Sequence, residues 1–208
     1  VIGNHVAGHP VAVHAVTDAQ LVVTIAALRT AGVLAGDRIE HAAVVPPDCI
    51  ADLADLGITV VTQPNFVAER GDQYLAEVPV SQHDQLWRVA TLAGAGVPVA
   101  LSTDVPFGAG DPWAAMRAAV HRRTPSGAVL AAAERISPAT ALRGFLGRPD
   151  RPAVPRRIAP GEPGDLCLLS ERSAWFLAGL GSFLLGHVAF ALAFAMGPLD
   201  PQAGAVGG

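Results

Sequence analysis

The chain has 208 residues, of which 51% are hydrophobic and 15% are charged, and its formal net charge is −4. This length is enough to bury a core and corresponds to one domain or slightly more. The small negative charge gives no electrostatic reason to expect a nucleic acid or an anionic membrane as a partner, so we expect no nucleic-acid partner.

From residue 10 to about residue 121, short apolar runs alternate with amphipathic ones. This alternation is typical of repeated strand–helix units built around a parallel sheet, and four units can be counted. The predicted strands are 10–14, 38–41, 58–62 and 97–101, and the predicted helices are 19–31 behind an Asp18 cap, 46–56, 82–95 and 112–121, with a polar loop over about 65–79.

The C-terminal part is less regular. A further helix is predicted over 136–146, a linker over 148–164 and a short strand over 165–169. From Trp175 to Met196 no Asp, Glu, Lys or Arg occurs, and these 22 residues reach the roughly 20 apolar residues with which a helix crosses a bilayer. A buried or disordered apolar tail is the alternative interpretation.

Polar side chains stand where four of the predicted strands end, namely His14, His41, Gln63 and the Ser102-Thr103-Asp104 run. The carboxyl ends of strands in a parallel α/β barrel build one common site. Two imidazoles and a carboxylate are ligands that zinc favours. A single histidine in such a place is usually structural, but the shared position after successive strands indicates a metal site.

Four motifs, in this order and spacing, resemble the amidohydrolase superfamily and, within it, the YtcJ-like group called amidohydrolase family 3. The resemblance covers about residues 8–170. The motifs are VAVHAVTD (11–18), RIEHA (38–42), QP (63–64) and LSTDVP (101–106), followed by DP (111–112), ISPATAL (136–142) and PGEPGDL (160–166).

The resemblance implies an α/β fold that is the C-terminal half of a TIM (β/α)8 barrel, with about four βα units. Residues 1–147 would form this half barrel. Residues 148–171 would form a linker and the returning strand of a small β-sandwich, as its remnant. Residues 172–208 would form an apolar helix, which could span a membrane, and a disordered tail.

The resemblance also implies the chemistry. His14 and His41, on the family's fifth and sixth strands, would bind a divalent metal, zinc or alternatively manganese or iron. Asp104, on the eighth strand, would bind the metal and act as general base, so that metal-activated water cleaves the C–N bond of a small amide or cyclic amide. Gln63 is a candidate substrate-binding residue.

Other polar residues are expected to be structural. Arg38 and Glu40 lie at odd separations from His41, so their side chains should point away from it and pair with each other behind the barrel. The remaining histidines are expected on the surface or in loops, and both cysteines are expected as small core residues in a reducing cytoplasm: His5, His9, His83, His121, Cys49 and Cys167.

The family's first-strand His-x-His pair has no counterpart in this sequence, which starts at Val1 without a signal peptide. We therefore expect a truncated or fused piece of doubtful activity, whose open barrel edges would allow a homodimer. Residues 176–190 are similar to the YhhN family of membrane proteins, which includes lysoplasmalogenases. The alternative function is thus a non-catalytic, membrane-anchored remnant, and the expected location is cytoplasmic or membrane-associated through residues 175–196.

Overall fold

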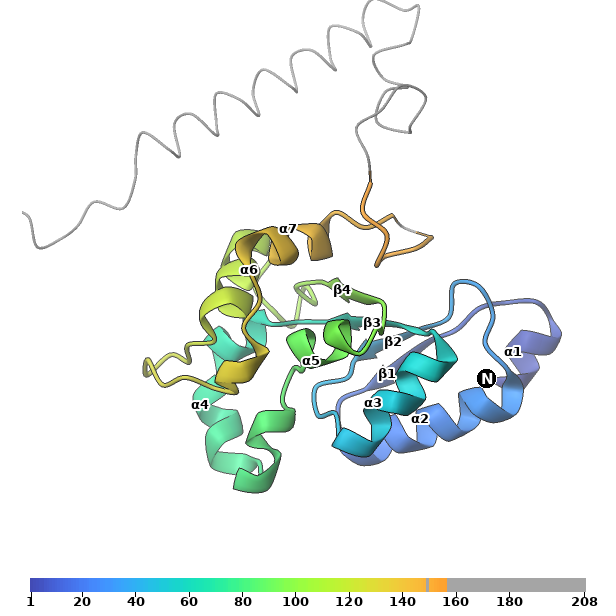
Figure 1. The fold of residues 1–208 in the computed structure, drawn as a ribbon, viewed down its shortest axis with the longest axis horizontal. Coiled ribbons are helices and arrows are strands. Elements are labelled where there is room, and N and C mark those ends of the chain that lie inside the picture. The colour runs from blue at the N-terminus through green and yellow to red at the C-terminus, as the bar shows by residue number, and fades with distance from the viewer. Residues whose placement is uncertain (149, 157–208) are drawn as a thin grey trace, which may run out of the picture. The chain divides into compact units, whose positions relative to one another are not determined.

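The computed structural model describes residues 1–148 and 150–156, which form a mixed α/β unit around one parallel sheet (Figure 1). Each strand lies within one of the predicted apolar runs or extends it by one residue. Consecutive strands pair in the order in which they occur along the chain, as expected for repeated strand–helix units. The strands are β1 (Ala12–Ala15), β2 (Arg38–His41), β3 (Thr59–Thr62) and β4 (Val99–Leu101).

Helices follow each strand, and their caps are local sequence features. Thr17, rather than the predicted Asp18, caps α2, because its side chain and that of Gln20 exchange hydrogen bonds with backbone amides in a capping box. Asp111 and Ser137 cap α6 and α7 through side-chain oxygens that accept from backbone amides of the first turn. The helices are α1 (Ile2–Val6), α2 (Asp18–Ala31), α3 (Pro47–Leu56), α4 (Asn65–Glu77), α5 (Val89–Gly94), α6 (Pro112–His121) and α7 (Pro138–Phe145), with 3-10 turns η1 (Val80–Gln85) and η2 (Ala132–Glu134).

The main core lies between one face of the sheet and helices α2 and α3, which run along that face (Figure 1). Because side chains alternate along a strand, Ile39 faces this core while its neighbours Arg38 and Glu40 face the opposite side. The fully buried core side chains include Leu21, Leu28, Ile39, Leu53, Ile58 and Val60, and Cys49 is buried among them as predicted.

The prediction of a polar loop over 65–79 was wrong, because residues Asn65–Glu77 form helix α4. The helix buries Phe66 and Val67, and it also buries Gly71, a residue that weakens a helical signal in sequence. A Cβ atom at Gly71 would lie 2.6 Å from Cγ2 of Thr124, so glycine is required for this close packing. Gly71 is therefore a contact residue of a helix.

The predicted single helix over 82–95 was also wrong, because it is interrupted between η1 and α5. The amide of Val45 donates to the carbonyl of Gln85 at 2.9 Å, and the amide of Trp87 donates to the carbonyl of Ala43 at 2.9 Å. Trp87 has a φ of 47°. These tertiary hydrogen bonds replace the ones that a continuous helix would make, so the chain leaves the helical conformation at Leu86 and Trp87.

Several C-terminal predictions lie outside the described residues, namely the strand over 165–169, the β-sandwich remnant, Cys167 and the apolar stretch 175–196. Among the residues that the structure describes, none belongs to a helix with the length and hydrophobicity needed to cross a membrane.

Candidate functional site

The four strands run in parallel, so their carboxyl ends, with the polar residues that follow them, meet at one edge of the sheet. His14 lies in β1 beside Glu40 of β2 in the strand register, and Ala15 lies beside His41. His41 ends β2 with a φ of 74°, and Asp104 follows β4 with a φ of 58°. Both lie in the left-handed region that few residues other than glycine adopt, and such conformations are common at functional sites.

His14, His41 and Asp104 line one cavity of about 280 Å³. The two imidazole rings meet edge to face, with their centroids 4.3 Å apart. Nδ1 of His41 lies 3.9 Å from Oδ2 of Asp104. The three residues that the sequence singled out as ligands therefore line the same cavity, although two lie in separate strands and the third in the loop after another strand.

Gln63 lies directly behind His41 and fixes its orientation. The Gln63 side chain is 1% exposed, and its Nε2 donates to the Val61 carbonyl at 3.3 Å and to Oγ of Ser102 at 2.9 Å. Because a carbonyl can only accept, this assigns Oε1 to the side of His41, where it lies 2.8 Å from Nδ1. Nδ1 of His41 is thus the hydrogen-bond donor in this contact.

The arrangement around His41 fits a metal ligand, because metal-binding histidines usually donate their other ring N–H to a neighbouring acceptor. The donor types also fit, since imidazole nitrogens and a carboxylate suit zinc. Within residues 1–148 and 150–156, however, no group of three or more His, Cys, Asp or Glu side chains is placed to hold an ion. The described residues therefore supply suitable ligand chemistry without a complete preformed metal site.

Gln63 was predicted to bind substrate, whereas in the structure its side chain is buried and hydrogen bonded to protein groups at each polar atom. A role in holding His41 accounts for these contacts. Substrate contact by Gln63 stays a prediction.

The rest of the cavity wall was not anticipated. It is largely aromatic, with Arg70 stacked on Phe66 at 4.9 Å from the ring centroid and Tyr74 packed edge to face on Trp87 at 4.6 Å. Burial raises the pKa of Tyr74, so its hydroxyl is neutral at physiological pH. These residues lie in the two segments whose secondary structure was predicted wrongly, so no sequence pattern placed them near the histidines. The further lining residues are Val16, Ala43, Phe66, Arg70, Tyr74, Trp87 and Phe107.

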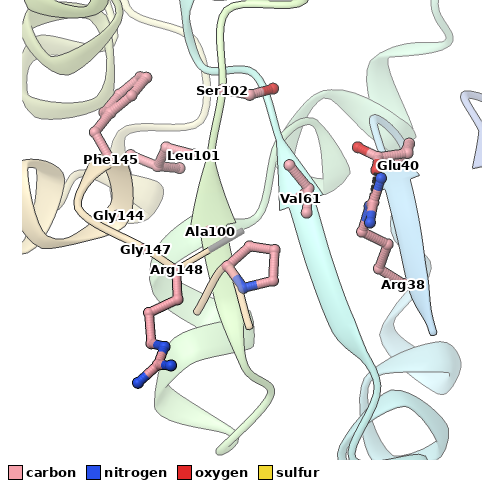
Figure 2. A pocket seen from close by; sticks show the side chains of 11 residues that line it. Arg38, Glu40, Val61, Ala100, Leu101, Ser102, Gly144, Phe145, Gly147 and Arg148 are labelled. Carbon is pink, nitrogen blue, oxygen red and sulfur yellow. Dashed lines mark hydrogen bonds and ion pairs between the residues drawn. The ribbon is translucent and has the colours of Figure 1, made fainter. Parts of the chain in front are cut away.

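Arg38 and Glu40 line a different cavity of about 360 Å³, on the sheet face opposite the main core. Figure 2 shows the two side chains joined by an ion pair on one strand, with Phe145 and Arg148 across the cavity. The predicted pairing is confirmed, whereas the predicted place behind the barrel was wrong, because the pair lies on the sheet face opposite helices α2 and α3. His5 departs from its expected surface or loop position, because it lies in α1 with its side chain 6% exposed and paired with Asp37 at 3.1 Å.

Comparisons with known proteins agree with this geometry. A family model described as the amidohydrolase family matches residues 2–174, and a model for the YhhN family matches residues 161–207. N-substituted formamide deformylase of Arthrobacter pascens is 33% identical over 113 residues, which cover 54% of this chain and 21% of that protein.

Two crystal structures of uncharacterised metal-dependent hydrolases are also similar. The one from Pyrococcus furiosus has a TM-score of 0.57 and 30% identity, covering 66% of this chain and 28% of the other. The one from Pyrococcus horikoshii OT3 has a TM-score of 0.60 and 29% identity, covering 68% of this chain and 29% of the other. The chain thus spans less than a third of the length of each of these three proteins.

Proposed function

This chain belongs to the amidohydrolase family, whose model matches residues 2–174, and on that premise we propose that it carries part of a metal-dependent hydrolase site for amide-type C–N bonds. The observation that carries the proposal is the meeting of His14, His41 and Asp104, from three strands, at one cavity. The relatives described as metal-dependent hydrolases and as a deformylase of N-substituted formamides support it. Membership of the YtcJ-like group and a half-barrel architecture are parts of the same proposal.

In this proposal His14, His41 and Asp104 hold a divalent cation, with zinc as the first choice. A bound cation of this kind lowers the pKa of water toward about 7 and polarises a carbonyl group. Asp104 takes the proton from water at its carboxylate and passes it to the leaving amine. Gln63 keeps Nδ1 of His41 protonated, which leaves Nε2 to act as the ligand.

The test is a zinc titration of the purified chain, followed by calorimetry, alongside a His14→Ala, Asp104→Ala double variant. We expect the variant to lose at least about tenfold in zinc affinity, because two of the three proposed ligands are gone. A His121→Ala, Asp55→Ala double variant removes the same residue types at exposed positions and should bind as the wild type does. Equal binding by all three proteins would remove the site.

Activity requires a separate assay. N-substituted formamides are the first substrates to try, because the Arthrobacter pascens relative is named for them. Release of the amine would be compared between the metal-loaded wild type and the Asp104→Ala variant. Turnover that does not depend on Asp104 would contradict its role as general base.

The match of residues 161–207 to the YhhN model favours a second candidate, a non-catalytic chain anchored to a membrane by residues 175–196. Fractionation of cells that produce the full chain separates the two proposals. Recovery in the membrane fraction after an alkaline wash, together with no zinc binding, would favour the second candidate. Recovery only in the supernatant would reject it.

A further inference from the structure

The loop that carries Asp104 is tied to helix α4 at both of its ends. Nδ2 of Asn65 donates to the carbonyl of Thr103 at 3.2 Å, immediately before Asp104. The amide of Ala109 donates to Oε1 of Glu69 at 3.1 Å, at the far end of the loop. Neighbouring turns of one helix therefore hold residues on both sides of Asp104.

The two holding side chains are themselves joined. Nδ2 of Asn65 also donates to Oε1 of Glu69 at 3.0 Å, which is the i, i+4 spacing that places side chains on one helix face. Asn65 is 2% exposed, and because both of its partners are acceptors, the orientation of its amide is fixed. A third tie comes from Arg70, whose Nη2 donates to the carbonyl of Phe107 at 2.6 Å.

The loop has little freedom to adopt another path. The amides of Phe107 and Gly108 both donate to the carbonyl of Asp104, at 2.8 and 2.9 Å, while Asp104 itself holds a left-handed φ of 58°. A Cβ atom at position 108 would lie 2.1 Å from the carbonyl oxygen of Thr103 and 2.5 Å from Nδ2 of Asn65. An uncommon backbone conformation of this kind persists where its surroundings determine it.

We propose that Asn65 and Glu69 are positioning residues for Asp104, and that they aim its carboxylate into the cavity that His14 and His41 line. The proposal rests on the function proposed above and extends it, because it assigns a role in the site to a helix that supplies none of the three proposed ligands. Neither residue needs to touch the cation or the substrate. Both act through the backbone of residues 103–109.

The test compares zinc affinity in four proteins: wild type, Glu69→Ala, Glu69→Gln and Gln73→Ala. Loss of a residue that orients a metal ligand typically lowers metal affinity about 10–100-fold. The zinc affinity of Glu69→Ala should therefore be lower than that of wild type by about tenfold or more. Glu69→Gln keeps an oxygen that accepts from Ala109 and should stay within about threefold of wild type. Gln73→Ala loses an α4 side chain that bonds only Glu77, and it should bind as wild type does.

To distinguish positioning of Asp104 from a purely structural role of Glu69, the zinc affinity of Glu69→Ala is also measured in the Asp104→Ala variant. If Glu69 acts through Asp104, its substitution has no further effect on affinity once the carboxylate is absent. An additive loss in the double variant would overturn the proposal, and so would a Glu69→Ala variant that binds zinc as wild type does.

Hydrogen exchange of the metal-free proteins keeps this proposal distinct from the proposed function. The amide of Ala109 should exchange faster in Glu69→Ala than in wild type or Gln73→Ala, because its acceptor is lost. Equal exchange would show that Glu69 does not hold the loop. If the wild type binds no zinc, the proposed function fails, and the positioning role fails with it even where exchange shows that the loop is held.

Discussion

At the scale of single residues, His41 depends on a chain of buried hydrogen bonds behind it. Its Nδ1 is bonded to Gln63, and Gln63 is in turn bonded to Ser102 and to the Val61 carbonyl. The chain crosses from β2 through the end of β3 to the end of β4, so three neighbouring strands fix the orientation of one imidazole. A hydrogen bond to one ring nitrogen of a histidine decides which nitrogen is left to bind a metal.

Replacing Gln63 by Leu tests this dependence. The variant keeps the approximate volume but removes the acceptor for Nδ1, so we expect zinc affinity to fall by about 10–100-fold. Stability should also fall by about 1–3 kcal/mol, because buried polar groups lose their partner. Calorimetry with zinc and urea unfolding measure the two effects.

Ser102→Ala is the matched control, because it removes one bond of Gln63 and leaves the bond to His41 in place. Because Gln63 keeps its bonds to His41 and to the Val61 carbonyl, we expect Ser102→Ala to lose less zinc affinity than Gln63→Leu. A Gln63→Leu variant with unchanged affinity would contradict the role of Gln63.

The sequence was sufficient to place His14, His41 and Asp104 in one region, because each follows an apolar run and parallel strands end together. It was not sufficient for the rest of the cavity. Trp87 lines the cavity because its backbone bonds Ala43 and its conformation is left-handed, and neither fact has a signal in the local sequence. Tertiary hydrogen bonds, rather than periodicity, position these residues.

At the scale of elements, Arg122 explains why the segment before α5 is not helical. Its side chain is fully buried and donates to the carbonyls of Leu86, Trp87 and Leu130 at 2.8, 3.2 and 3.0 Å. The carbonyls of Leu86 and Trp87 lie in the interruption, so the guanidinium supplies hydrogen bonds there in place of helical ones. Burial lowers the pKa of Arg122 to about 10, with Glu134 opposing the shift, so the group stays charged at neutral pH.

We expect Arg122→Met to destabilise the protein by about 3 kcal/mol or more, because three buried carbonyls lose a charged donor. Arg123→Met is the matched control, since Arg123 is exposed and bonds only the Gly127 carbonyl, and its cost should stay within about 0.5 kcal/mol. Urea unfolding of both variants gives the comparison. Equal stability of the two variants would contradict the proposed contribution of Arg122.

The two wrong predictions at this scale share a cause. Helix α4 was missed because its segment is polar, whereas its buried side, including Gly71 against Thr124, is set by contacts with residues distant in sequence. The helix over 82–95 was predicted too long because Arg122 stabilises a break within it. In both cases a residue distant in sequence determines the local structure, and residues within the segment carry no sign of it.

At the scale of the whole molecule, the described sheet has two outer strands, β1 and β4, with no strand partner beyond them among residues 1–148 and 150–156. A closed barrel of this class has eight strands and about 250 residues. The Arg38–Glu40 pair and the 360 Å³ cavity lie on the face that the interior of such a barrel would enclose. We propose that a second copy of the chain covers these strand edges.

A lysine introduced into the outer strand β1 tests whether the chain associates with itself. Ala12 is an exposed residue of β1, and lysine on an edge strand opposes pairing with another strand, so Ala12→Lys should shift the protein toward monomer. Ala51→Lys adds the same charge at an exposed position on α3 and should associate as wild type does. Sedimentation velocity over a concentration series measures this. We expect the sedimentation coefficient of the wild type to rise with concentration and that of Ala12→Lys to stay lower. A wild type that sediments as a monomer at every concentration would exclude pairing between copies, and the outer strands would then be exposed or covered in some other way.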